Sequence, residues 1–155
     1  MFSISETSID ATKLKENFSN SHAGAFVSFE GWVRDHNEGK EVLTLEYEAY
    51  DQLCNNEAQA IFAEVREKFG VIEVCCVHRT GALKIGELAV WVGVSSAHRG
   101  DAFAACRYLI DEIKSRLPIW KKETYLNGTT GWVNCQTHCA HTQPHQEASP
   151  APLHR

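Results

Sequence analysis

Apolar side chains alternate with polar ones along some stretches of the chain and recur every three or four residues along others. Residues 25–33 and 42–50 show the two-residue period of half-buried strands. Residues 71–79 are almost continuously apolar and rich in β-branched side chains, as in a strand that is buried on both faces. Similar patterns at 87–95 and 131–133 complete the prediction of five strands.

The first two strands are joined by the polar segment 34–41, which is predicted to be a loop because it contains Asn and Gly among charged residues. Loops at the ends of rigid strands are common places for ligand contacts. We expect strand 42–50 to pair antiparallel with the strand before it. Its apolar face should consist of alternate side chains, namely Leu43, Leu45, Tyr47 and Ala49.

Helical spacing occurs in three places along the chain. A short helix ends near Phe18, and Ser8 or Asp10 is suited to cap it. A long helix is predicted over 51–69, and Gly70 after it suits a stop in the left-handed conformation.

A second long helix precedes Pro118, which ends it because proline lacks a backbone N–H and its ring clashes with the preceding turn. Ser96 is the expected cap of this helix. Lys114 falls beside the apolar stripe, so its stem should lie at the margin of the buried face. The predicted stripe comprises Phe103, Cys106, Ile110, Ile113 and Leu117.

The predicted element order is helix, strand, strand, helix, strand, strand, helix, strand. This order indicates an α+β fold in which two long helices pack against a largely antiparallel sheet. The chain has 155 residues, enough for one domain with a real core. We assign residues 1–134 to this domain and residues 135–155, rich in His, Pro and Gln, to a disordered tail.

The overall charge and hydropathy exclude some classes of partner. The formal net charge is −5, whereas proteins that track nucleic-acid phosphates usually present a net basic surface. No apolar run approaches the ~20 residues needed to cross a bilayer. The first residues also lack a basic region followed by an apolar stretch. We therefore expect a cytoplasmic protein that binds neither nucleic acid nor membrane.

The cysteines predict neither a disulfide framework nor a metal centre. Those at positions 54, 75, 76 and 106 fall inside predicted helices or strands without a Cys-x-x-Cys pair, which indicates reduced, buried thiols. The end of the chain does contain residue types that bind zinc, but not in the paired spacing of structural zinc sites. These residues are Cys135, His138, Cys139, His141 and His145. We expect no metal and no cofactor.

The segment around Pro118 is the strongest candidate for chemistry. If residues 119–125 form a strand, Lys121 and Glu123 share one face while Lys122 lies on the other. Lys114 then approaches from the end of the preceding helix. Two ammonium groups beside one carboxylate suit an anionic substrate and acid–base or amine chemistry, because crowding and desolvation lower the pKa of a lysine. The alternative is a pair of solvated lysines that complement a helix dipole.

Other basic residues stand at the ends of predicted elements. His98 and Arg99 open a predicted helix, where unpaired N–H groups already favour an anion, so they form a candidate phosphate site. Arg34 follows the first strand. In contrast, His78 and Arg79 end a buried strand, which favours a structural ion pair or hydrogen bond.

Five blocks of the sequence together resemble the large, catalytic subunit of molybdopterin synthase, and the resemblance covers roughly residues 24–132. The combination of SAHR with PxWK about twenty residues later is specific, whereas each short block alone is weak. The blocks are GAFVSFEGWVRDHNEGK, LEYEAY, HRTGALKIGE, VGVSSAHRGDAF and PIWKKE.

The resemblance implies a hammerhead-like α/β fold and a sulfurtransferase. Such enzymes add the two dithiolene sulfurs of molybdopterin to cyclic pyranopterin monophosphate, also called precursor Z. The sulfur comes from the C-terminal thiocarboxylate of a small ubiquitin-like subunit, which sits at each end of a central homodimer of large subunits to give a heterotetramer. By position, the resemblance implies catalytic roles for Lys121 and Lys114. It also implies substrate-binding roles for Arg34, His98, Arg99, Lys122 and Glu123.

The sequence departs from the family pattern after Trp132. We expect relatives to carry a basic residue shortly after this tryptophan, reaching toward the neighbouring subunit's pocket, but here no Lys or Arg occurs before Arg155. Two other functions remain open. The chain could be a non-catalytic scaffold for the ubiquitin-like subunit, or an unrelated domain that binds a nucleotide phosphate. The second is disfavoured because no GxxxxGK or GxGxxG loop follows a predicted strand.

Overall fold

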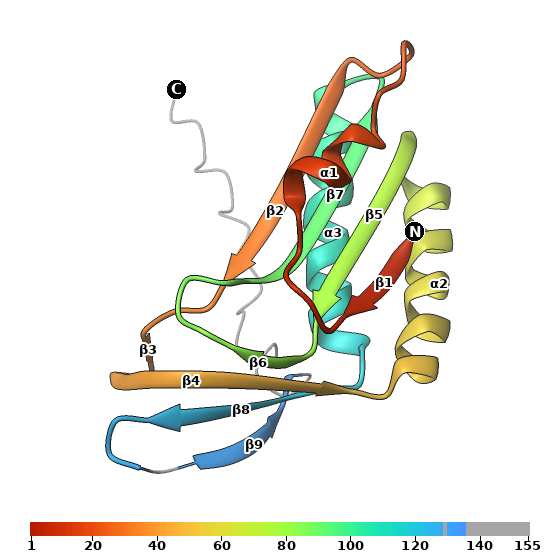
Figure 1. Cartoon of the computed structure of the whole chain (residues 1–155). Helices are drawn as coiled ribbons and strands as arrows, with labels where there is room; N and C mark the ends of the chain where they lie inside the picture. The colour runs from red at the N-terminus through yellow and green to blue at the C-terminus, as the bar shows by residue number, and fades with distance from the viewer. Residues whose placement is uncertain (129, 136–155) are drawn as a thin grey trace, which may run out of the picture.

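The structure, a computed structural model, describes residues 1–128 and 130–135 and contains two sheets (Figure 1). The first sheet has four strands in the order β1-β5-β7-β2. β1 and β5 are parallel, and the other neighbours are antiparallel. The strands are β1 (Phe2–Ser5), β5 (Val71–Arg79), β7 (Leu88–Ser96) and β2 (Ala25–Trp32). The sequence did not predict the short edge strand β1.

The second sheet crosses one end of the first and is wholly antiparallel (Figure 1). Its strands follow the order β3-β4-β8-β9, and β6 also pairs with β4. They are β3 (His36–Asn37), β4 (Lys40–Ala49), β8 (Ile119–Tyr125), β9 (Thr130–Asn134) and β6 (Gly81–Leu83). β3 and β6 were not predicted. The α+β class with mostly antiparallel sheets is confirmed.

The predicted pairing of the first two long strands is wrong. β2 pairs with β7, whereas β4 pairs with β8 and belongs to the other sheet. The chain leaves the first sheet after an irregularity at Gly31 and Trp32. It then forms a tight hairpin from β3 to β4, in which Glu38 and Gly39 both have positive φ. This backbone suits a two-residue hairpin turn, so the polar loop is itself partly a strand.

The strict alternation predicted for β4 also fails at one point. The pairing of β4 with β8 shifts between Val42 and Thr44, as in a bulge. Val42 is therefore buried, whereas Leu43 is exposed. Leu45 and Tyr47 follow the predicted alternation and are buried.

The helices are α1 (Ala11–Glu16), α2 (Asp51–Lys68) and α3 (Arg99–Arg116). Asp10 caps α1, as predicted, by accepting a hydrogen bond from the N–H of Lys13. Gly70 is not left-handed, because α2 instead ends at Phe69 in an extended conformation. No helix within 1–128 or 130–135 is long and apolar enough to cross a membrane.

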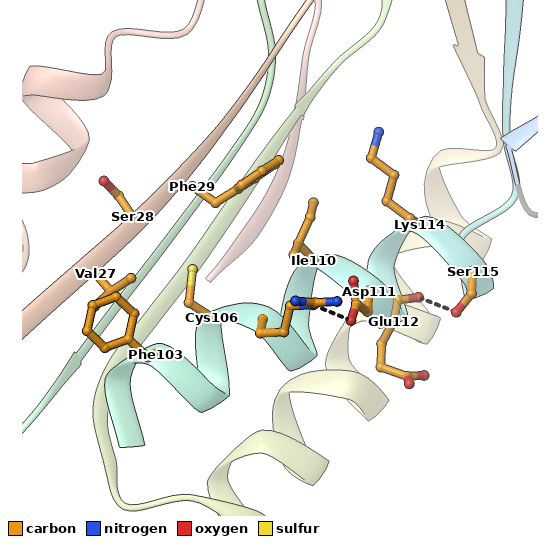
Figure 2. A pocket seen from close by; sticks show the side chains of 11 residues that line it. Val27, Ser28, Phe29, Phe103, Cys106, Ile110, Asp111, Glu112, Lys114 and Ser115 are labelled. Carbon is orange, nitrogen blue, oxygen red and sulfur yellow. Dashed lines mark hydrogen bonds and ion pairs between the residues drawn. The ribbon is translucent and has the colours of Figure 1, made fainter. Parts of the chain in front are cut away.

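The start of α3 differs from the prediction. Ser96 is the last residue of β7, and the N-cap position is occupied by His98, whose side chain makes no capping hydrogen bond. Phe103 is exposed and not part of the buried stripe (Figure 2). Ala102, Ala105 and Leu109 are buried in its place. The end of α3 is as predicted, since Leu117 is the C-cap and Pro118 follows.

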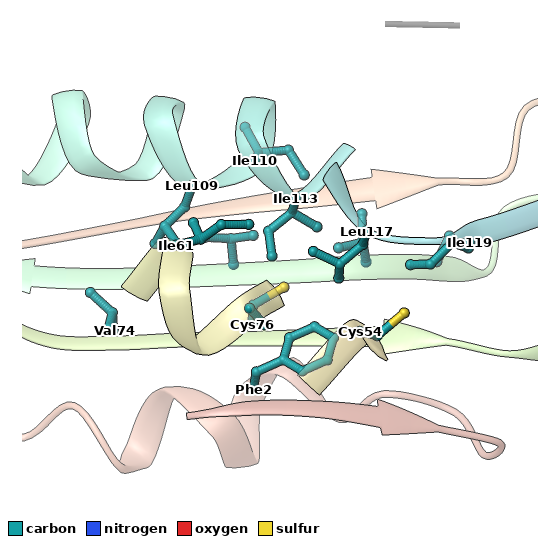
Figure 3. Packing of buried hydrophobic residues seen from close by; sticks show 14 of the residues in the cluster. Phe2, Cys54, Ile61, Val74, Cys76, Leu109, Ile110, Ile113, Leu117 and Ile119 are labelled. Carbon is teal, nitrogen blue, oxygen red and sulfur yellow. The ribbon is translucent and has the colours of Figure 1, made fainter. Parts of the chain in front are cut away.

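The main core lies between the first sheet and the layer of α2 and α3 (Figure 3). Ile61 and Phe62 of α2 and Leu109 and Ile113 of α3 belong to one buried cluster with apolar side chains of the sheet. Burying a large apolar side chain contributes roughly 1.5–3 kcal/mol, so this layer supplies much of the stability. α1 covers the opposite face, where Phe18 packs edge-on against Trp91.

The free cysteines fit this packing. Cys54, Cys75, Cys76 and Cys106 are buried thiols, as predicted. Cys135 is partly buried at the end of the described chain. The predicted tail, from 136 onward, lies outside the described residues.

Candidate functional site

A polar cavity of about 120 Å³ lies where the end of α3 meets the second sheet. Its walls come from the segment after β2, from β3, β4 and β8, and from the last turn of α3. The polar side chains that line it are Arg34, His36, Asn37, Lys114, Lys121 and Glu123. Four of the predicted site residues therefore meet in one cavity.

The turn at Pro118 is what brings the two lysines to the same cavity. Lys114 occupies the last turn of α3, and the chain then reverses into β8. In β8, Lys121 and Glu123 lie opposite Tyr47 and Leu45 of β4. Because strand side chains alternate, both point to the cavity face, as predicted.

Lys121 and Glu123 form a shielded ion pair. The Nζ of Lys121 is 3.2 Å from Oε1 of Glu123, and their side chains are only 19% and 10% exposed. Water therefore screens this pair much less than an ion pair on an open surface. A lysine held in this way presents its remaining donors in a fixed direction.

Two further side chains hold the carboxylate of Glu123. The amide of Asn37 donates to Oε1 at 3.1 Å and to Oε2 at 2.9 Å. The hydroxyl of Tyr125 donates to Oε2 at 2.5 Å. Burial alone raises the pKa of Glu123, but these donors and the Lys121 ammonium outweigh burial and lower that pKa below its usual value. Glu123 is therefore ionised at neutral pH.

Behind the cavity lies a buried aromatic pair. Tyr47 lines the cavity, and its ring meets His78 edge-on, with centroids 5.0 Å apart. Burial raises the pKa of Tyr47, so its hydroxyl keeps its proton. Burial also lowers the pKa of His78 to about 4, which leaves the imidazole neutral. This wall of the cavity is uncharged at physiological pH.

His78 and Arg79 have the structural roles predicted for them. The Nδ1 of His78 lies 2.8 Å from the carbonyl of Arg79, which can only accept, so Nδ1 carries the proton and donates. Arg79 pairs with Glu87 at 3.2 Å. Neither residue lines the polar cavity.

His98 and Arg99 do not lie in the cavity of their own chain. They stand at the start of α3, whereas Lys114 stands in its last turn. With the usual helical rise, Arg99 lies about 22 Å along the axis from Lys114. One molecule therefore cannot bring both groups to one small ligand.

The predicted substrate contact of Lys122 is not supported by its position. Lys122 lies on the opposite face of β8, where it pairs across the strands with Trp132. Its ammonium is 5.6 Å from the centre of that indole ring. We therefore leave Lys122 out of the candidate site.

A larger groove of about 980 Å³ runs between β2 and α3 (Figure 2). Phe29 and Phe103 line it and are 37% and 63% exposed. Lys114 lines both this groove and the polar cavity. The groove thus runs along the helix that separates the two groups of basic residues.

Asn37, Tyr125 and Tyr47 were not predicted from the sequence as site residues. Tyr125 shares the face of Lys121 and Glu123 by simple alternation, so the pattern contained a signal for it. Asn37 carried a weaker signal, as a polar residue in a loop after a strand. Within the described ranges, no group of three or more His, Cys, Asp or Glu side chains is placed to hold a metal ion.

Comparison with known proteins gives a consistent result. A family model described as MoaE protein matches residues 4–116. A molybdopterin synthase catalytic subunit from Thermoplasma volcanium is 40% identical over 129 residues, which are 83% of this chain and 94% of that protein. One from Arabidopsis thaliana is 42% identical over 120 residues, and the chain spans 61% of its length.

Solved structures agree with the sequence comparison. The crystal structure of molybdopterin synthase from Staphylococcus aureus matches with a TM-score of 0.79 and 39% identity, over 84% of this chain and 95% of that one. A complex of subunits 1 and 2 of molybdopterin-converting factor from Helicobacter pylori matches with a TM-score of 0.70 at 21% identity, which shows the fold alone. The chain therefore belongs to the MoaE family of molybdopterin synthase catalytic subunits, which confirms the resemblance found in its sequence.

Proposed function

We propose that this chain transfers sulfur in molybdenum cofactor biosynthesis, converting cyclic pyranopterin monophosphate to molybdopterin. The sulfur donor is the C-terminal thiocarboxylate of a small ubiquitin-like subunit. One observation carries the proposal: Lys114 and Lys121 meet in one polar cavity with Arg34 and an ionised carboxylate. A scaffold that only bound the small subunit would have no evident need for this arrangement.

The charges of the cavity suit an anionic substrate. Arg34, Lys114 and Lys121 bring three cationic side chains to one small space, and Glu123 offsets one of them. An arginine guanidinium binds phosphate oxygens through two parallel hydrogen bonds. Arg34 therefore suits the cyclic phosphate, while the lysines face the carbons that receive sulfur.

Two chemical roles are open to Lys121. As an acid or base it would move protons while the cyclic phosphate opens and sulfur adds to carbon. As a nucleophile its amine would attack the thiocarboxylate carbonyl, so that an amide forms, the C–S bond breaks and the released hydrosulfide adds to the substrate carbon. Mass spectrometry of the enzyme after turnover distinguishes the two roles, because only the nucleophile leaves the carrier tail attached to Lys121.

A second copy of the chain accounts for His98 and Arg99. In a two-fold dimer with antiparallel α3 helices, the start of α3 in one copy lies near the end of α3 in the other. His98 and Arg99 of the partner subunit then reach the cavity that contains Lys114. The groove between β2 and α3 offers an apolar surface for this contact, since Phe29 and Phe103 are exposed there.

This arrangement also bears on the missing basic residue after Trp132. Asn134 is the last residue of β9 and Cys135 follows it. Neither side chain can carry a positive charge. In the proposed dimer, Arg34 of one copy and Arg99 of the other provide the guanidinium groups for the phosphate. The small subunit then completes the heterotetramer by placing its C-terminal tail at the cavity.

The test is a reconstituted assay with the purified protein, a thiocarboxylated ubiquitin-like subunit and the cyclic pyranopterin. Product is measured as a fluorescent oxidised pterin. We expect Lys121→Ala to lower the rate by a factor of about 10² to 10⁴, the usual contribution of a proton-transfer group. Lys68→Ala is the control, because Lys68 is the last residue of α2 and does not line the cavity.

Two results would contradict the proposal. Full activity of Lys121→Ala would remove that lysine from the chemistry. Binding of the small subunit without any product from the wild-type protein would instead favour the scaffold function.

A further inference from the structure

We propose that Asn37 and Tyr125 are positioning residues that fix Glu123 as a holder of Lys121, so that Glu123 itself does not contact the substrate. This inference rests on the proposed function for its catalytic consequence. Its structural part stands on the hydrogen bonds around one carboxylate. It gives Glu123 a positioning role in place of the substrate-binding role that the family resemblance implies.

The carboxylate of Glu123 has no acceptor site left for a substrate. An ionised carboxylate has about four lone-pair sites. Oε1 of Glu123 accepts from Asn37 and faces the Lys121 ammonium, while Oε2 accepts from Asn37 and Tyr125. Every site is therefore occupied, so a substrate donor would have to displace one of these groups.

The two donors to Glu123 come from different elements of the second sheet. Asn37 belongs to the two-residue strand β3, and Tyr125 is the last residue of β8. The carboxylate therefore ties the short hairpin to the strand that carries Lys121. Arg34 lies on the segment that leads into this hairpin, so the same hydrogen bonds also restrict the position of Arg34 relative to Lys121.

The cluster formed by Glu123, Asn37 and Tyr125 is shielded from water. Glu123 is 8% exposed, and both donors are partly buried. The ammonium of Lys40 lies over the Tyr125 ring, 5.3 Å from its centre. Charge-assisted hydrogen bonds are roughly twice as strong as neutral ones, so this cluster resists rearrangement.

Glu123 is surrounded by several ionisable groups. Those on β8 are Lys121 and Tyr125, and Tyr47 faces it from β4. Arg34, His36 and Lys114 line the same cavity from other elements. Removing the Tyr125 hydroxyl leaves all of these groups in place, so Tyr125→Phe isolates a single donor.

The test combines a structural and a kinetic measurement on the full chain. In Tyr125→Phe we expect the pKa of Glu123, followed by ¹³C NMR of its side-chain carboxyl, to rise by about one unit, because a donor to the charged form is lost. In the reconstituted assay we expect kcat to fall about tenfold with KM for the pterin within twofold. The apparent pKa on the acidic side of the pH profile of kcat should rise together with the pKa of the Glu123 carboxyl.

Two further variants complete the design. Asn37→Ser removes donors from the other element and should raise the same carboxyl pKa, even if Tyr125→Phe folds poorly. Tyr50→Phe is the matched control, since Tyr50 is 61% exposed and does not line the polar cavity. It should change neither the carboxyl pKa nor kcat.

The outcomes separate this inference from the proposed function. An unchanged Glu123 pKa in both variants would overturn the positioning role, whatever the activity. A raised pKa with unchanged kcat would overturn its catalytic consequence. If the wild-type protein makes no product, the proposed function fails, but the NMR titration still decides whether Asn37 and Tyr125 hold the carboxylate.

Discussion

Neutral His78 makes the fold sensitive to acid in a way that can be calculated from the structure. Burial lowers the pKa of His78 from 6.5 to about 4, so the unfolded chain binds this proton more tightly than the folded chain. The stability that depends on neutral His78 is complete above pH 6.5 and is lost as the pH falls toward 4. The free energy of unfolding falls by about 3.4 kcal/mol when the imidazole is protonated in both states, and by about 2.5 kcal/mol at pH 4.5.

The perturbation is His78→Gln, which keeps a donor for the carbonyl of Arg79 but does not titrate. Free energies of unfolding from urea titrations at pH 7.5 and pH 4.5 give the acid-induced loss for each protein. We expect the wild-type loss to exceed the variant's by about 2.5 kcal/mol, because all other titrating groups cancel in the comparison.

The control is His22→Gln, since His22 is exposed and its substitution should leave the wild-type pH dependence in place. Equal acid-induced losses in wild type and His78→Gln would refute the reasoning. They would mean that the folded protein accommodates a charged imidazole beside Tyr47.

Two other predictions concern packing and thiol chemistry. A Cβ at Gly24 would clash with the backbone carbonyl of Ala97, so Gly24→Ala should lower the free energy of unfolding by about 1–3 kcal/mol in urea titrations. The matched variant Gly100→Ala places its Cβ in open space within α3, so it should raise the free energy of unfolding by up to about 1 kcal/mol. A Gly24→Ala protein as stable as wild type would contradict this. Burial raises the pKa of Cys54 to about 11 and raises that of Cys76 as well, so neither thiol should react with a disulfide reagent at pH 8 until urea unfolds the protein. Rapid labelling of either thiol in the native protein would show that the core opens locally.

Periodicity predicted most of the elements of this fold because long helices and long strands repeat their pattern several times. The strand over 71–79 and the two long helices are correct to within a few residues. β1, β3 and β6 were missed, since strands of two to four residues do not establish a period. Partner choice was wrong for β4, because its partner β8 lies far away in sequence and only packing selects it.

The candidate site was partly predictable for a related reason. Alternation in β8 placed Lys121 and Glu123 on one face, and the proline break placed Lys114 beside them. The separation of Arg99 from Lys114 was implicit in the predicted helix itself, since a rise over fifteen helical residues spans about 22 Å. Of the two donors to Glu123, Asn37 needed the structure, because it comes from a hairpin that the sequence pattern does not show.

The turn at Pro118 has a consequence for inherited or engineered variation in this chain. Lys114 lies on α3, which packs on the first sheet, and Lys121 lies on β8 of the second sheet. Only a few residues join them, so the distance between the two lysines depends on the angle between these two parts of the fold. A substitution at the seam between the sheets that tilts one layer slightly would move the lysines apart without touching either. Such a variant would melt normally and yet be inactive, so a thermal screen alone would classify it as harmless.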